Sequence, residues 1–194
     1  MILKRLRNET IQHHDALERQ LPVLSALFTL EDYRQLLARF YGYYKPLEER
    51  LTLAARRENA FYEQDRRCKS QFLEQDLMVL DVSTIRDLKQ MPRCEKLPLL
   101  ENIPQLLGCL YVLEGATLGG QMIASHLQKN FGLTPQTGTA FYYGHGEETA
   151  RRWQVFGGGL KAEAQKANAD DEIVESANRT FETMSHWLFP KTED

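Results

Sequence analysis

The sequence predicts an all-α fold, and two observations carry that prediction. Apolar residues recur at helical spacing along most of the 194 residues, whereas the period-two alternation typical of strands is nearly absent. Prolines and N-cap residues then divide the chain into segments of helix length. Because no internal repeat, low-complexity tract or linker is visible, we expect one domain over residues 1–194.

The first half of the chain predicts two long helices. Residues 3–21 carry apolar side chains at helical spacing and end before Pro22. Thr29 is a suitable N-cap for a second helix over residues 30–57, in which Pro46 predicts a kink.

The second half predicts shorter helices around one dominant one. Residues 104–130 form the strongest pattern, with proline in the first turn and Gly132 at the exit. Period-two alternation in residues 139–143 is too short to found a sheet, so residues 134–146 are expected to form a loop. The remaining predicted helices span residues 70–80, 83–89, 147–166 and 170–189, with an interruption at the three glycines 157–159.

Charge and cysteine content narrow the function classes. Lys and Arg number 24 against 27 Asp and Glu, and this net charge of −3 offers no general attraction to nucleic acid or an anionic membrane. Cys68, Cys94 and Cys109 form no metal-binding spacing, so free thiols in the cytoplasm are expected. Residues 106–124 are apolar but are interrupted by Glu114 and glycines, which indicates a buried helix rather than a membrane span.

The first helix carries a candidate metal ligand. Thr10, His14 and Glu18 are spaced by four residues and therefore share one helix face. A carboxylate one turn from a histidine can hold one ring nitrogen while the other faces a metal. A surface histidine beside a helical charge pair is the alternative.

The dominant helix accepts glycines at a cost of about 1 kcal/mol each relative to alanine. Gly115 and Gly119 lie one turn apart and form a smooth strip, against which a flat ligand could lie or another helix could pack. A histidine helix and a glycine-kinked helix together suggest a slot for iron porphyrin.

Three segments of the chain resemble the haem oxygenases, and specifically their bacterial biliverdin-producing branch. Residues 10–18 resemble the proximal-helix motif of that family, and residues 114–121 resemble the distal-helix motif. Residues 41–48 fit the same branch. The resemblance implies a helical bundle with haem held between the first helix and the glycine-kinked distal helix, with His14 as the iron ligand.

The resemblance also implies the reaction. Haem would be both cofactor and substrate, opened with O2 to biliverdin, carbon monoxide and ferrous iron, with the backbone of Gly115 and Gly119 on the distal side. Haem propionates need basic or hydroxyl partners, for which Arg7, Arg151, Arg152 and Tyr143 are the candidates. Thr10 and Glu18 share the His14 face, and Glu18 would orient the His14 ring. One departure is Ala116, where animal members carry an aspartate.

The sequence also bears on partners. It holds no flavin motif and no iron–sulfur cysteine set, so electrons would come from a ferredoxin or flavodoxin reductase system, or from ascorbate in vitro. A biliverdin-accepting protein is a further expected partner. A non-catalytic haem carrier or sensor is the alternative that Ala116 leaves open, and a haem-free enzyme of the same fold is a more remote one.

Overall fold

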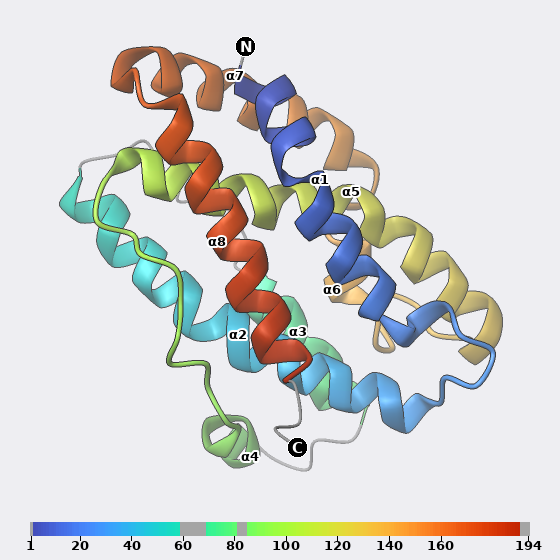
Figure 1. Cartoon of the computed structure of the whole chain (residues 1–194). Coiled ribbons are helices and arrows are strands. Elements are labelled where there is room, and N and C mark those ends of the chain that lie inside the picture. Colours follow the sequence, from blue (N-terminus) through green and yellow to red (C-terminus); the bar gives the residue numbers. More distant parts are fainter. Residues whose placement is uncertain (1, 59–68, 81–84, 191–194) are drawn as a thin grey trace.

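The computed structural model describes residues 2–58, 69–80 and 85–190, and those residues form helices and connecting turns (Figure 1). The described residues contain no strand, so the all-α prediction is confirmed. The helices are α1 (Ile2–Gln20), α2 (Leu30–Arg57), α3 (Lys69–Val79), α4 (Ile85–Gln90), α5 (Ile103–Phe131), α6 (Ala140–Tyr143), α7 (Thr149–Ala167) and α8 (Asp170–Leu188), and single 3-10 turns lie at Pro22–Leu24 and Gly146–Glu148.

Helix ends follow the local signals in the sequence. The Oγ1 of Thr29 accepts the amide N–H of Asp32 at 3.1 Å, and the Asp32 carboxylate accepts the amide N–H of Thr29 at 2.9 Å. This capping box fixes the start of α2. The Oδ1 of Asn102 accepts the amide N–H of Gln105 at 3.0 Å and caps α5, and Gly132 ends it with a left-handed φ of 69°.

Two local expectations are wrong. The region expected to be a loop over residues 134–146 contains α6 and leads into a 3-10 turn. The glycines 157–159 do not interrupt α7, because the buried side chains of Phe156 and Leu160 on either side hold the helix against its neighbours. The helix expected over residues 83–89 is described only from Ile85, and its first residues lie outside the described part of the chain. Pro46 lies inside α2, which continues to Arg57.

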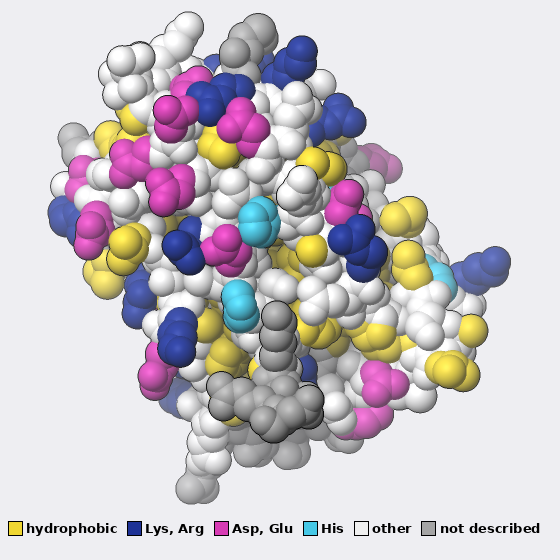
Figure 2. All heavy atoms as spheres, viewed as in Figure 1, with side chains coloured by type: hydrophobic (Ala, Val, Ile, Leu, Met, Phe, Trp, Pro, Cys, Tyr) yellow, Lys and Arg dark blue, Asp and Glu magenta, His cyan; other side chains and the backbone are white. Residues whose placement is uncertain are grey.

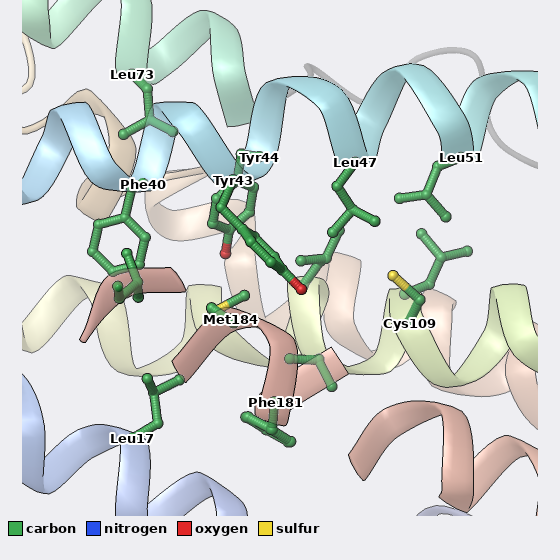
Figure 3. Close-up of a cluster of buried hydrophobic side chains, with 14 of the residues drawn as sticks. Leu17, Phe40, Tyr43, Tyr44, Leu47, Leu51, Leu73, Cys109, Phe181 and Met184 are labelled. Atoms are coloured by element: carbon green, nitrogen blue, oxygen red, sulfur yellow. The ribbon is translucent and has the colours of Figure 1, made fainter. Parts of the chain in front are cut away.

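The core lies where α2 and α8 pack against α5 (Figure 3). Phe40, Tyr43 and Tyr44 point from α2 into this cluster, where they lie near Phe181 and Met184 of α8. The hydroxyl of Tyr43 donates to the carbonyl of Thr180 at 3.1 Å, so its polar end is satisfied inside the core. This packing makes α5 a rigid central element.

Helix α5 is long and apolar enough to meet the length and composition test for a membrane span. In this fold 44% of its most apolar window is buried, and the helix packs against α2, α6, α7 and α8. Its apolar composition is therefore accounted for by its position as the central core helix.

Candidate functional site

His14 lies on α1 with a carboxylate near each ring nitrogen. Nδ1 is 3.3 Å from Oδ1 of Asp15, and Nε2 is 3.4 Å from Oε1 of Glu18. The ring packs edge-on against Phe181 of α8 at 5.9 Å between centroids, which ties it to the core. Because 45% of the His14 side chain and 61% of the Glu18 side chain are exposed, either carboxylate can swing away and leave a nitrogen open to a metal.

The glycines of α5 fall into two groups that serve different purposes. A Cβ added to Gly108 would collide with the carbonyl oxygen of Ile173, and one added to Gly120 with that of Tyr142, so these glycines allow close helix packing. A Cβ at Gly119 would meet nothing within 4 Å, and one at Gly115 would meet only the ring of Trp153 at 3.9 Å. Packing of the chain therefore does not explain Gly115 and Gly119.

Helices α1 and α5 meet at Tyr111. Burial raises the pKa of Tyr111, and the hydroxyl of Thr10 and the charge of Arg7 partly oppose that rise, which places both α1 residues beside the phenol. The Tyr111 ring packs against Trp153 of α7, with 5.8 Å between the ring centroids, and Trp153 lies against Gly115. From this contact α1 and the second half of α5 run toward the same end of the molecule (Figure 1).

His14 on α1 and Gly115 on α5 each lie one helical turn beyond this contact. His14 comes one turn after Thr10, and Gly115 comes one turn after Tyr111, so we expect the two to face the same space. Thr10 itself is buried, and its hydroxyl donates to the carbonyl of Leu6 at 2.7 Å. It therefore helps to close the end of this space rather than lining the open part.

Both helices expose apolar side chains beside these positions. On α1, Ile11 is 43% exposed and lies one turn from His14. On α5, Leu118 and Met122 are exposed on either side of Gly119, Met122 by 66%. An apolar surface of this kind, next to a glycine strip, marks a binding site for an apolar ligand.

The basic side chains predicted to pair with the propionates differ in the hydrogen bonds that they make within the chain. The Nε of Arg152 is buried and has no hydrogen-bond partner among the described residues. Its neighbour Arg151 donates to the Glu148 carboxylate at 2.6 Å and is exposed. Arg7 is exposed on the His14 face of α1. A buried guanidinium nitrogen without a partner is costly, and Arg152 is therefore the cation best suited to receive an anionic ligand group.

These features fit a flat, largely apolar group with anionic edges and a metal centre. His14 offers the metal a ring nitrogen, Gly115 and Gly119 allow backbone to approach a planar face, and Arg152 and Arg7 offer positive charge. The site geometry is thus compatible with haem, which carries two propionates and an iron.

Tyr143 reaches the site region through α6, which a buried carboxylate holds in place. Asp76 of α3 accepts the amide N–H groups of Ala140 and Phe141 at 2.7 and 2.8 Å. The Tyr143 ring lies over Gly146, and Gln121 of α5 donates to the Gly146 carbonyl. Tyr143 is 42% exposed, so its hydroxyl remains open to a ligand or to solvent.

Burial raises the pKa of Asp76 to about 6, against the opposing effect of its two backbone hydrogen bonds. The folded protein therefore holds a proton on Asp76 over pH 4–6 that the unfolded chain has released, so stability attributable to this group falls as pH rises through that window. We expect the difference in unfolding free energy between the wild type and Asp76→Asn to change by about 2 kcal/mol from pH 4 to pH 7.

Urea unfolding of both proteins at the two pH values measures this change. Asp76→Asn should also be less stable than the wild type, because an amide can accept only one of the two N–H groups without turning its own donor toward the other. A difference that stays constant between the two pH values would contradict the assignment of this titration to Asp76.

A separate hollow of about 350 Å³ lies between α1 and α8, on the face shown in Figure 2. It is lined by Arg5, Glu9, Asp171, Val174, Glu175, Asn178, Arg179 and Glu182. Acidic side chains gather over this face where α8 begins. Its largely charged lining differs from the apolar glycine face, and His13, which lies 3.8 Å from Glu182, faces this side.

Some residues of the site were not foreseen from the sequence. Tyr111 lies one turn before Gly115, so helical spacing could have placed it on the glycine face. Asp76 acts across 64 residues of sequence, and no local pattern marks it. His145 packs edge-on against Phe72 of α3 rather than at Gly119.

Comparisons with known proteins bear on the family and the fold. A family model described as Heme oxygenase matches residues 1–189. A solved structure described as heme oxygenase from Leptospira interrogans superposes with a TM-score of 0.76, at 16% sequence identity, over 96% of this chain and 98% of that one. At that identity the superposition shows a shared fold. No curated protein sequence matches the chain.

Proposed function

The chain belongs to the heme oxygenase family, and from that premise we propose that it cleaves haem oxidatively to biliverdin, carbon monoxide and ferrous iron with O2 and external electrons. The observation that carries the proposal is the pair Gly115 and Gly119, which the packing of the chain leaves unexplained. We place them opposite His14 because Tyr111, one turn before Gly115, lies beside Thr10 and Arg7 of α1. The family and the fold support haem degradation in general, and the product and the residue roles are our proposal.

In this proposal His14 binds the haem iron through one imidazole nitrogen. Nε2 is the better placed of the two, because it is the end of the ring farther from the backbone. Glu18 then leaves Nε2, and a carboxylate remains at Nδ1, where it orients the ring and increases the basicity of the ligand. A neutral histidine donates less electron density than a thiolate and so favours O–O cleavage less.

The distal side is formed by backbone. Gly115 and Gly119 let α5 approach the plane of the ligand closely, and the exposed side chains of Leu118 and Met122 would be covered on binding. Haem, when bound, supplies the redox-active iron and is itself the ring that is oxidised. Ala116 is exposed and places no acid on this helix beside Gly115.

Arg152, Arg7 and Tyr143 are the proposed partners of the propionates. Replacing Arg152 with leucine should lower hemin affinity by about tenfold to a hundredfold, because a charge-assisted hydrogen bond is lost. The variant should fold at least as well as the wild type, since it removes a buried nitrogen that has no partner. Equilibrium hemin titration and thermal unfolding measure the two effects.

Arg151→Leu is the matched control, because Arg151 is already paired with Glu148 and is exposed. It should leave hemin affinity close to that of the wild type. Equal losses in the two variants would indicate a general effect of helix charge and would contradict the role given to Arg152.

The proposal includes an external electron donor, either a ferredoxin or flavodoxin reductase system in the cell or ascorbate in vitro. It also includes a cytoplasmic location, which the free thiols Cys94 and Cys109 support. A protein that accepts biliverdin is a further proposed partner.

Optical titration with hemin, followed by ascorbate in the presence of catalase, tests the proposal. We expect the Soret band to saturate at one haem per chain, and then to decay in air but not under nitrogen as a biliverdin band rises. A band that saturates and persists in air, also with a ferredoxin reductase system, would favour the haem carrier or sensor instead. No saturable Soret band would contradict both.

A further inference from the structure

A buried lysine contacts α5 on the side away from the glycine face. Lys69 begins α3, and 9% of its side chain is exposed. Its Nζ donates to the carbonyl of Leu113 at 2.5 Å and lies 3.4 Å from Oε1 of Glu114. Burying an ammonium group costs several kcal/mol unless it is well bonded, and the site described above gives this group no role.

The base of this side chain is fixed by a second buried charge. The Glu48 carboxylate of α2 accepts the amide N–H of Lys69 at 2.6 Å and that of Ser70 at 3.2 Å. Glu48 therefore anchors the first turn of α3 to α2. The ammonium of Lys69 thus reaches α5 from a position that the core holds rigid.

Leu113 and Glu114 lie near the middle of α5, a helix that changes direction along its length (Figure 1). In a regular helix the Leu113 carbonyl accepts the amide N–H of Thr117, and here it also accepts from Lys69. The next carbonyl, that of Glu114, accepts the Thr117 hydroxyl at 2.5 Å. A helix bends where extra donors enter its hydrogen-bond ladder, and Gly115 directly after them offers the least resistance.

The direction of the bend matters for the site. Carbonyls that tilt toward outside donors lengthen the helix on that side, so the helix becomes convex there. Residues 113 and 117 lie across the helix from Gly115 and Gly119. The two ends of α5 therefore curve toward the side that faces α1.

We propose that Lys69 is a positioning residue that, by holding the Leu113 carbonyl, sets how closely the backbone of Gly115 and Gly119 approaches bound haem. The inference rests on the proposed function, because it assigns a residue to the same site. Lys69 touches neither the ligand nor His14 in this role and acts through α5 alone.

Amide hydrogen exchange of the haem-free protein tests this placement directly. In Lys69→Met, which keeps the length of the side chain but donates no hydrogen bond, exchange in residues 113–119 should accelerate about tenfold, as expected for the loss of a charge-assisted bond. Thr117→Val removes the other extra donor and should accelerate the same segment. Lys69→Arg, which retains a charged donor, should restore protection.

Hemin-loaded samples supply a second readout. Lys69→Met should retain hemin affinity while its rate of ring opening falls by about tenfold or more, because the distal backbone is displaced. Unchanged exchange in residues 113–119, or equal acceleration across all helices including α8, would overturn the proposal. If the wild type itself neither binds nor opens hemin, the proposed function fails, whereas the exchange measurement still decides the role of Lys69 in shaping α5.

Discussion

Replacing His14 with alanine is expected to abolish the histidine-ligated ferric spectrum of the hemin-loaded protein. The ring is the one group on the exposed face of α1 that can offer the iron a nitrogen opposite the glycines of α5. Without it, hemin would be held by apolar contact and propionate pairing alone, and affinity should fall by at least about tenfold. Absorption spectra of the ferric complex and equilibrium titration measure both effects.

His13→Ala is the matched control for this experiment. His13 neighbours His14 in sequence, but it lies on another face of α1, 3.8 Å from Glu182 of α8. This variant should keep the wild-type spectrum, and added imidazole should restore a nitrogen-ligated spectrum to His14→Ala but change little in His13→Ala. A His14→Ala protein with the wild-type spectrum would place the ligand elsewhere in the chain.

Replacing Gly119 with leucine should stabilise the haem-free protein and weaken hemin binding at once. A Cβ there meets no neighbouring atom within 4 Å, so the helix gains about 1 kcal/mol of propensity, equivalent to roughly 2–4 °C in Tm. The same side chain would occupy the space proposed for the ligand and should lower affinity by about tenfold to a hundredfold. Thermal unfolding and hemin titration of one preparation measure the two opposite effects.

Two other glycines serve as controls. A Cβ at Gly158 of α7 also meets nothing within 4 Å, so Gly158→Leu should raise Tm similarly without changing hemin affinity. Gly120→Ala should lower Tm, because its Cβ would collide with the Tyr142 carbonyl. If Gly119→Leu bound hemin as tightly as the wild type, the glycine strip would not be the distal face.

The sequence predicted the fold where local signals agree with one another. The cap at Thr29, the exit at Gly132 and the apolar spacing of α5 each specify a helix boundary from a few neighbouring residues. The prediction was wrong for α6 and for the glycines 157–159, where contacts with other helices override weak local propensity. Asp76, which holds α6 from 64 residues away, shows why no local reading could find that helix.

The candidate site also has features that the sequence predicts and features that it does not. The faces of His14 and Gly119 follow from helical periodicity, and their pairing across one slot stays a prediction. The sequence could not separate glycines that serve packing, such as Gly108, from those that face open space, such as Gly115, because the distinction depends on what lies opposite each one. The role of Lys69 depends likewise on how α3 docks against α5.

The most direct test of the account is the yield of carbon monoxide from a single turnover. One equivalent of hemin is loaded on the protein and reduced with ascorbate in air with catalase present, and the released gas is trapped by a separate globin added in excess. We predict close to one carbon monoxide per haem in the wild type, together with biliverdin, and almost none in His14→Ala. Loss of the Soret band without carbon monoxide in the wild type would mean nonspecific bleaching and would contradict the assignment of this chain as a haem-cleaving enzyme.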